Sequence, residues 1–135
     1  MRSCLSLLIG VNNQYRGRSV FDFATEFEGL LKIAVKCAND IPAHVIIVSI
    51  PDWGVTPFAA GRDINKIAEE IDQYNAVCES MAAKYGTHFI DITTAQRAGS
   101  ADLAFLATDK LHPSGKEYNK WAIRLSEMII EMMAQ

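Results

Sequence analysis

The sequence has few of the residues that mark several common protein classes. Its 135 residues include three cysteines, Cys4, Cys37 and Cys78, and no Cys-x-x-Cys pair. An odd number without that spacing argues against a disulfide framework and a cysteine zinc site, and favours free, buried thiols in a reducing compartment. The apolar run near the amino end is short and leads directly into Asn12, so we interpret it as a strand rather than a secretion signal. We therefore expect a cytoplasmic location.

Basic runs, long apolar runs and glycine-rich phosphate loops are also missing. Thirteen Lys and Arg residues face sixteen Asp and Glu residues, a formal net charge of −3, which argues against nucleic acid and anionic membrane surfaces as partners. No apolar run is long enough for a membrane span. Without a phosphate loop, and with no ligand pattern joining His44, His88 and His112, we expect neither a cofactor nor a bound metal.

Apolar runs and helical periods alternate along the chain. Continuous apolar runs predict parallel strands buried on both faces, and apolar residues at 3.6-residue spacing predict helices between them. The expected strands are Leu5–Ile9, Val45–Ile50 and Phe89–Ile92, and the expected helices begin near Ser19, Asp63 and Ser114.

The residues at the helix ends are also informative. Ser19 and Asp63 are expected N-caps, Gly86 a helix terminator, and Ser114 with Glu117 a capping box. We expect a polar loop over 10–18 and an irregular stretch or short helix over 93–108. The inward positions expected for the last helix are Tyr118, Trp121, Ala122, Leu125, Ile129 and Met132, and Ile64 is expected inward at the start of the helix before it.

This alternation predicts an α/β fold in a single domain spanning 1–135, with three layers and helices on both faces of a parallel sheet. Ligands of such sheets bind beyond the carboxyl ends of the strands. The polar residues of the loops expected there should surround one site: Gly10, Asn12, Asp52, Trp53, Asp109 and His112.

The loop from Asp109 to Gly115 has the residue types of acid–base catalysis. A carboxylate three residues before an imidazole can hold that ring in one tautomer, leaving the other ring nitrogen to take a proton from a nucleophile. The Asn12 amide can donate to the oxyanion of a tetrahedral intermediate, an effect worth roughly 3 kcal/mol. Ordinary turn and cap roles remain the alternative for all three residues.

Three further residues are candidates for contact with a substrate. Gly10 lets the backbone turn sharply and approach a ligand closely. Asp52 and Trp53 follow the second expected strand, and Trp53 with Phe58 either lines an acyl or alcohol pocket or packs the loop.

Taken together, these motifs resemble a known family. Gly10-Val11-Asn12-Asn13 after an apolar strand, Asp109-x-x-His112-Pro113 before the last helix, and Ser49-Ile50-Pro51-Asp52 are similar to the SGNH (GDSL-type) ester hydrolases over essentially the whole chain. The resemblance implies a flavodoxin-like sheet and a lipase- or esterase-like activity on a small ester or acylated substrate. It also implies an oxyanion donor in Asn12, a general base in His112 and its orienting acid in Asp109. The family usually has Asp where this chain has Asn13.

The first two family blocks, which supply the nucleophilic serine and a glycine donor, have no counterpart. Only nine residues precede Gly10, and no other serine fits a strand-to-helix turn. We therefore expect the carboxyl-terminal two-thirds of the fold, with its first strands missing and no activity as given. The alternative is a non-catalytic binding or interaction domain. Because the missing strands would pair with Leu5–Ile9, we also expect a homo-oligomer through this exposed sheet edge.

Overall fold

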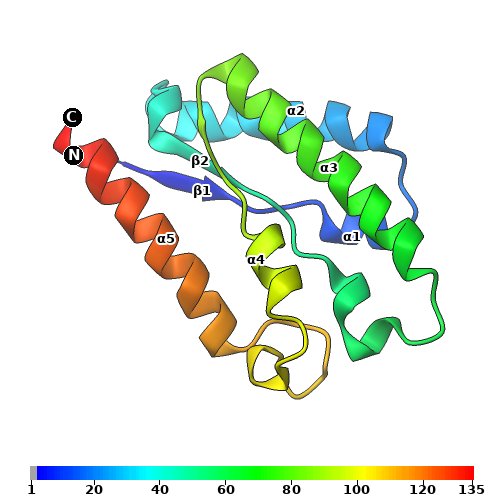
Figure 1. Ribbon diagram of the computed structural model, residues 1–135. Helices are drawn as coiled ribbons and strands as arrows, with labels where there is room; N and C mark the ends of the chain where they lie inside the picture. The colour runs from blue at the N-terminus through cyan, green and yellow to red at the C-terminus, as the bar shows by residue number, and fades with distance from the viewer. Residues whose placement is uncertain (1–2) are drawn as a thin grey trace. The chain divides into compact units, whose positions relative to one another are not determined.

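The computed structural model describes residues 3–135 (Figure 1). Strands and helices alternate along them, as expected. The elements are β1 (Leu5–Leu7), α1 (Val11–Tyr15), α2 (Val20–Cys37), β2 (Val45–Val48), α3 (Ile64–Tyr85), β3 (His88–Ile90), α4 (Thr93–Ala98) and α5 (Gly115–Ala134), with short 3₁₀ turns η1 (Pro42–His44), η2 (Trp53–Val55), η3 (Pro57–Ala59) and η4 (Leu103–Phe105).

These residues group into two compact units. The first extends to Ile50 and includes Glu70–Asp91, and the second consists of Pro51–Glu69 and Ile92–Gln135. Each unit is described by itself below, and the single-domain organisation stays a prediction.

The first unit contains a three-stranded parallel sheet in the order β1-β2-β3. In its register, Leu5 lies opposite Val45 and Ile47 opposite Phe89. All four residues of β2 are buried, as expected for a central parallel strand. The predicted α/β architecture, a parallel sheet flanked by helices, is therefore confirmed.

The predicted strands were too long. β1 ends at Leu7 rather than Ile9, β2 at Val48 rather than Ile50, and β3 at Ile90 rather than Ile92. β1 is also only partly buried: Ser6 is exposed, and Leu5 and Leu7 are half-buried. Leu8 and Ile9, just beyond the strand, are 42% and 41% exposed. Among residues 3–135, β1 pairs only with β2 and lies at an edge of the sheet.

α2 packs beside α3 in the first unit (Figure 1). Strands in sequence order with right-handed crossovers place the connecting helices on the same face. The rings of Phe23 and Tyr74 stack with centroids 4.2 Å apart. At the other end, the Glu28 carboxylate accepts hydrogen bonds from Lys84 Nζ at 2.6 Å and Tyr85 Oη at 2.5 Å. Apolar and polar contacts thus fix the two helices side by side.

Two of the predicted side-chain caps are confirmed, and the predicted capping box is wrong. Ser19 Oγ accepts the Asp22 N–H at 3.0 Å, and Asp63 Oδ1 accepts the Lys66 N–H at 3.0 Å. Ser114 is the N-cap residue of α5, as predicted, but its side chain makes no capping hydrogen bond. Its hydroxyl donates to the Ala104 carbonyl at 2.7 Å, because the chain before α5 folds back on itself.

The acid of the predicted capping box has another partner. Glu117 is buried and accepts the Trp121 indole N–H at 3.0 Å. Tyr118, expected inward, is about half exposed, because its ring packs edge-on against Trp121 and covers it. Ile64, also expected inward, is exposed at the first turn of α3.

The stretch expected as a polar loop contains a helix, α1, which begins after Gly10. The Gln14 N–H donates to the Gly10 carbonyl at 3.1 Å. The Gln14 side chain is buried and donates to Glu70 Oε2 at 2.8 Å. This long-range polar pair stabilises a short helix that local sequence preference does not predict.

Gly10 is constrained by backbone and packing together. Its φ is 134°, a region that residues with a Cβ rarely adopt, and an added Cβ would lie 2.8 Å from Phe23 Cε2. We predict that Gly10→Ala lowers the free energy of unfolding by roughly 2–4 kcal/mol, combining backbone strain with overpacking. Urea unfolding measures the change.

Two other glycines separate these causes. Gly17 has φ 74° and no neighbouring atom within 4 Å of an added Cβ, so Gly17→Ala should cost only about 1 kcal/mol of strain. Gly29 lies in α2 with no such neighbour, so Gly29→Ala should stabilise by about 0.5–1 kcal/mol. Equal losses for Gly10→Ala and Gly17→Ala would contradict the packing argument.

Candidate active site

A closed loop of the second unit carries the predicted acid and base. Leu106 and Pro113 form an isolated antiparallel bridge, and the Ala107 N–H donates to the His112 carbonyl at 2.8 Å. Pro113 restricts the backbone directly after the imidazole. The loop therefore holds both ends of its Asp109–His112 segment in place.

Within this loop, Asp109 folds its carboxylate over the residues that follow it. Oδ1 accepts the backbone N–H groups of Leu111 and His112, both at 2.9 Å. Oδ2 lies 2.5 Å from His112 Nδ1. Lys110, between them, has φ 58°, the left-handed conformation that closes this tight turn. The backbone thus orients the carboxylate before the imidazole contacts it.

The electrostatics of the pair favour a charged carboxylate. The hydrogen bond from His112, aided by the two backbone N–H groups, lowers the pKa of Asp109 from 3.8 to about 2. An ionised Asp109 accepts the proton on Nδ1, which leaves Nε2 of a neutral imidazole as a proton acceptor. The His112 side chain is 67% exposed, so this arrangement can serve as an accessible general base.

Asn12 and Gly10 belong to the first unit. Asn12 lies exposed in α1, where its carbonyl accepts the Arg16 N–H at 3.0 Å. The neighbouring Asn13 amide donates to Glu26 Oε2 at 3.1 Å. Since Asp109 and His112 belong to the second unit, the expected meeting of Asn12 with them stays a prediction.

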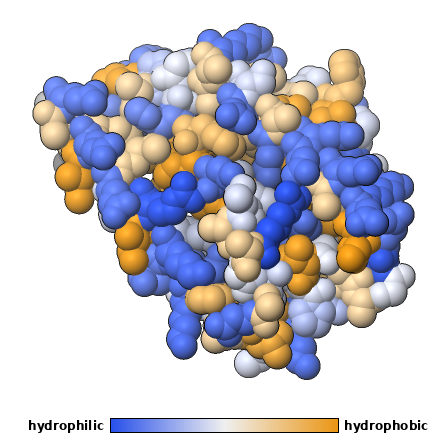
Figure 2. Space-filling model, viewed as in Figure 1, coloured by the Kyte–Doolittle hydropathy of each residue, from blue (hydrophilic) through white to orange (hydrophobic). Residues whose placement is uncertain are grey.

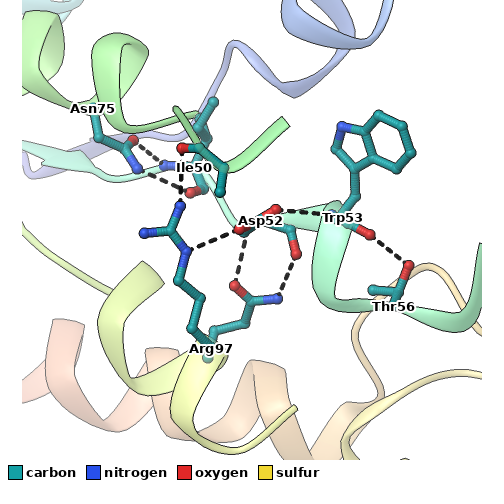
Figure 3. Close-up of polar contacts among 9 residues, drawn as sticks. Ile50, Asp52, Trp53, Thr56, Asn75 and Arg97 are labelled. Carbon is teal, nitrogen blue, oxygen red and sulfur yellow. Dashed lines mark hydrogen bonds and ion pairs between the residues drawn. The ribbon is translucent and has the colours of Figure 1, made fainter. Parts of the chain in front are cut away.

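Asp52 anchors the loop that follows β2 (Figure 3). It is 1% exposed. Its Oδ1 accepts the Gly54 N–H at 2.8 Å, and its Oδ2 accepts Arg97 Nε at 2.9 Å. The Gln96 amide brackets its backbone, accepting the Asp52 N–H at 2.9 Å and donating to its carbonyl at 3.0 Å. These contacts favour a structural role, and a substrate contact by Asp52 stays a prediction.

The amide of Asn75 holds Ile50 in the same way within the first unit (Figure 3). It accepts the Ile50 N–H at 2.8 Å and donates to the Ile50 carbonyl at 3.2 Å. Asn75, Gln96 and Arg97 were not singled out from the sequence, because a polar residue on a helix gives no sign of pairing with a distant loop.

Trp53 packs within the second unit. It is largely buried, with the Phe58 ring edge-on at 6.1 Å and the Arg62 guanidinium 5.4 Å from its ring centre. Phe58 remains 41% exposed. This geometry supports the loop-packing interpretation for Trp53 and leaves Phe58 as the accessible ring, while a substrate contact by Trp53 stays a prediction.

Serines offer little as nucleophiles in the contacts observed. Ser49 is 1% exposed and its hydroxyl lies 3.4 Å from Asp91 Oδ1. The Ser114 hydroxyl donates to the Ala104 carbonyl. Both hydroxyl groups therefore stabilise the fold.

The three cysteines are free, as predicted, but only Cys78 is buried, whereas Cys37 is exposed and Cys4 half-buried. Burial raises the pKa of Cys78 to about 12. Within residues 3–135, no three His, Cys, Asp or Glu side chains gather closely enough to hold a metal ion. None of the helices in this part of the chain combines the length and apolar character needed to cross a membrane.

The anchoring role of Asp52 can be tested by truncation. Asp52→Ala leaves the partly buried Arg97 charge without its carboxylate, so we expect a loss of about 3 kcal/mol in the free energy of unfolding. Asp102 caps η4 in the same way, accepting the Ala104 N–H at 2.9 Å, but is exposed. Asp102→Ala should therefore cost only about 1 kcal/mol. If urea unfolding gave similar losses of free energy for Asp52→Ala and Asp102→Ala, the ion pair of Asp52 with Arg97 would add nothing to stability.

The pKa of Asp109 gives a second test. Its lowered value means that the pair's contribution to stability is complete above pH 3.8 and is lost as the pH falls through about 2. His112→Ala should move the carboxyl-carbon NMR titration of Asp109 upward toward 3.8, stopping short of it because two backbone donors remain. His88→Gln should leave the curve unchanged. A midpoint unaffected by His112→Ala would show that the imidazole does not hold the carboxylate.

Comparison with known proteins supplies the context for this geometry. The comparison with curated proteins found no match. Among solved structures, the chain is similar to a single-substitution mutant of Axe2, an acetyl-xylooligosaccharide esterase from Geobacillus Stearmophilus, with a TM-score of 0.61 and 20% sequence identity. The match covers 99% of this chain and 61% of that one, so this chain spans about three-fifths of that esterase. A family model of the GDSL-like lipases and acylhydrolases matches residues 3–120, and the chain therefore belongs to that family.

Proposed function

We propose that this chain supplies the acid–base half of an ester hydrolase site. The observation that carries the proposal is the Asp109 carboxylate, oriented by two backbone N–H groups and lying 2.5 Å from His112 Nδ1. An ordinary turn requires the backbone contacts but not an imidazole held at the second oxygen. Membership of the GDSL-like family supports the same assignment.

In the proposed mechanism, each residue acts on a proton or on a developing charge. His112 Nε2 removes the proton from a hydroxyl nucleophile as it attacks the ester carbonyl, and later returns that proton to the leaving alcohol. Asp109 remains ionised and stabilises the imidazolium that forms between the two steps. The Asn12 amide donates a hydrogen bond to the oxyanion of the tetrahedral intermediate.

The proposed substrates are small acyl esters, lipids or acetylated sugars. The family comprises lipases and acylhydrolases, and the similar Axe2 enzyme is an esterase of acetylated xylooligosaccharides. The exposed Phe58 ring, packed against Trp53, offers an apolar surface for an acyl or sugar group. We propose a reducing compartment as the place of action, since all three cysteines are free.

We also propose that the 135-residue chain forms no acyl-enzyme by itself. No serine within the described residues 3–135 lies on a strand-to-helix turn of the kind that presents a nucleophile. The buried Ser49 supports this view. A fluorophosphonate probe, which labels activated serines, should therefore leave the chain unmodified by mass spectrometry.

Hydrolysis of p-nitrophenyl acetate tests the role of His112. The chain as given is expected to have no serine-dependent activity, but His112 can still act as a general base for water, so we expect a slow background turnover above the buffer rate, without a burst. His112→Ala should lower this turnover at least tenfold, and Asp109→Asn should lower it too because the ring loses its fixed tautomer. His88→Gln is the matched control, since it removes an imidazole from β3 and should leave the rate unchanged.

The same assay discriminates the alternative, a non-catalytic α/β binding domain. The alternative is favoured by the absence of a presented serine and predicts equal rates for the unmodified chain, His112→Ala and His88→Gln. That result would refute the proposed role of His112 while leaving the family assignment intact.

A further inference from the structure

The loop that carries the acid–base pair in the second unit has both of its ends joined by hydrogen bonds. The turn η4 precedes this loop and α5 follows it. The Ser114 N–H donates to the Phe105 carbonyl at 2.8 Å, and the Ser114 hydroxyl donates to the Ala104 carbonyl at 2.7 Å. η4 also packs against α5. The position of His112 between these two elements therefore depends on how they are held together.

Lys120 contacts both elements. It lies in α5, and its ammonium nitrogen is 3.4 Å from the centre of the Phe105 ring in η4. A cation over an aromatic face is attracted by the negative charge of the π electrons. Figure 2 shows hydrophilic and hydrophobic residues interspersed on the face in view, so exposure alone does not distinguish one lysine from another. Lys120 is distinguished by its contact with the ring of a second element.

Glu117 fixes where this ammonium group lies. Its carboxylate is buried, with Oε2 3.3 Å from Lys120 Nζ and Oε1 accepting the Trp121 indole N–H at 3.0 Å. A buried carboxylate requires such partners to offset its loss of hydration, so both contacts restrain the ion pair. The mechanism proposed above uses neither Glu117 nor Lys120. Together with the Phe105 ring, these two side chains connect α5 to η4.

We propose that Lys120 is a positioning residue of the acid–base pair. Its contact with the Phe105 ring holds η4 against α5, which sets the separation of the two ends of the loop. That separation keeps the Asp109 carboxylate on His112 Nδ1. The consequence for catalysis rests on the proposed function, whereas the consequence for the contact between Asp109 and His112 does not.

The carboxyl-carbon NMR titration of Asp109 tests the proposal, because a looser loop weakens the hydrogen bond from His112 that lowers this pKa to about 2. Lys120→Met keeps much of the side-chain bulk but removes the charge, and it should raise the midpoint by about half a pH unit or more. Lys120→Arg should restore the midpoint, since a guanidinium also stacks on an aromatic ring. Lys116→Met is the matched control: it removes the same charge from the exposed first turn of α5 and should leave the midpoint unchanged.

Two further variants separate positioning from a general loss of stability. Lys120→Met leaves the buried Glu117 carboxylate without its cation, which is itself destabilising. Combining it with Glu117→Gln removes both charges, and the new amide oxygen can still accept the Trp121 indole N–H. This double variant should keep the helical content by circular dichroism and still show the raised midpoint. Phe105→Leu should raise the midpoint as Lys120→Met does, and the two together should add no further shift.

The p-nitrophenyl acetate assay separates this proposal from the proposed function. Lys120→Met should lower the His112-dependent turnover about threefold to tenfold, because the base is less well placed, and Lys120→Arg should restore it. If the midpoint rises in Lys120→Met but His112→Ala leaves turnover unchanged, the positioning role stands and the proposed function fails. An unchanged midpoint in Lys120→Met, an equal shift in Lys116→Met, no rescue by Lys120→Arg, or a normal midpoint in the variant without either charge would overturn the positioning role.

Discussion

Parallel pairing on both sides of β2 is the constraint on which the rest of the first unit depends. Val45–Val48 is buried throughout and bonded to β1 on one side and β3 on the other. Parallel neighbours cannot be joined by tight turns, so each connection must cross the sheet as a helix. The carboxyl ends of all three strands then point the same way, and the polar segments of the chain follow those ends. The three strands therefore lie in sequence order in one short parallel sheet.

Much of this architecture could be predicted from short-range patterns. The 3.6-residue period located the long helices, and Ser19 and Asp63 marked where two of them begin. The 3.6-residue period did not predict a helix that depends on a contact with a residue distant in the sequence. Gln14 lies in a stretch that looks like a polar loop, yet its bond to Glu70 holds it in a buried helix. The predicted strand lengths were wrong for a related reason, since an apolar run in the sequence does not show which strand lies at an edge of the sheet.

The two aspartates singled out from the sequence differ in their surroundings. Asp109 bonds to backbone groups and an imidazole within three residues of itself, so local spacing was enough to predict the pair. Asp52 bonds to Arg97, forty-five residues away, and no local spacing predicts that contact. Burial then distinguishes the two carboxylates, because that of Asp52 is enclosed by hydrogen-bond donors of the fold, whereas that of Asp109 holds an exposed imidazole. Sequence spacing alone does not distinguish these environments.

The proposed catalytic role depends on Asp109 selecting one tautomer of His112. Nitrogen-15 NMR of the imidazole, recorded at a pH where the ring is neutral, reports directly which nitrogen carries the proton. The account predicts a proton on Nδ1, with Nε2 unprotonated, and a shift toward a mixture of tautomers in Asp109→Asn. A proton on Nε2 in the unmodified chain would contradict it, because the basic nitrogen would then be Nδ1, which faces Asp109 rather than a reactant.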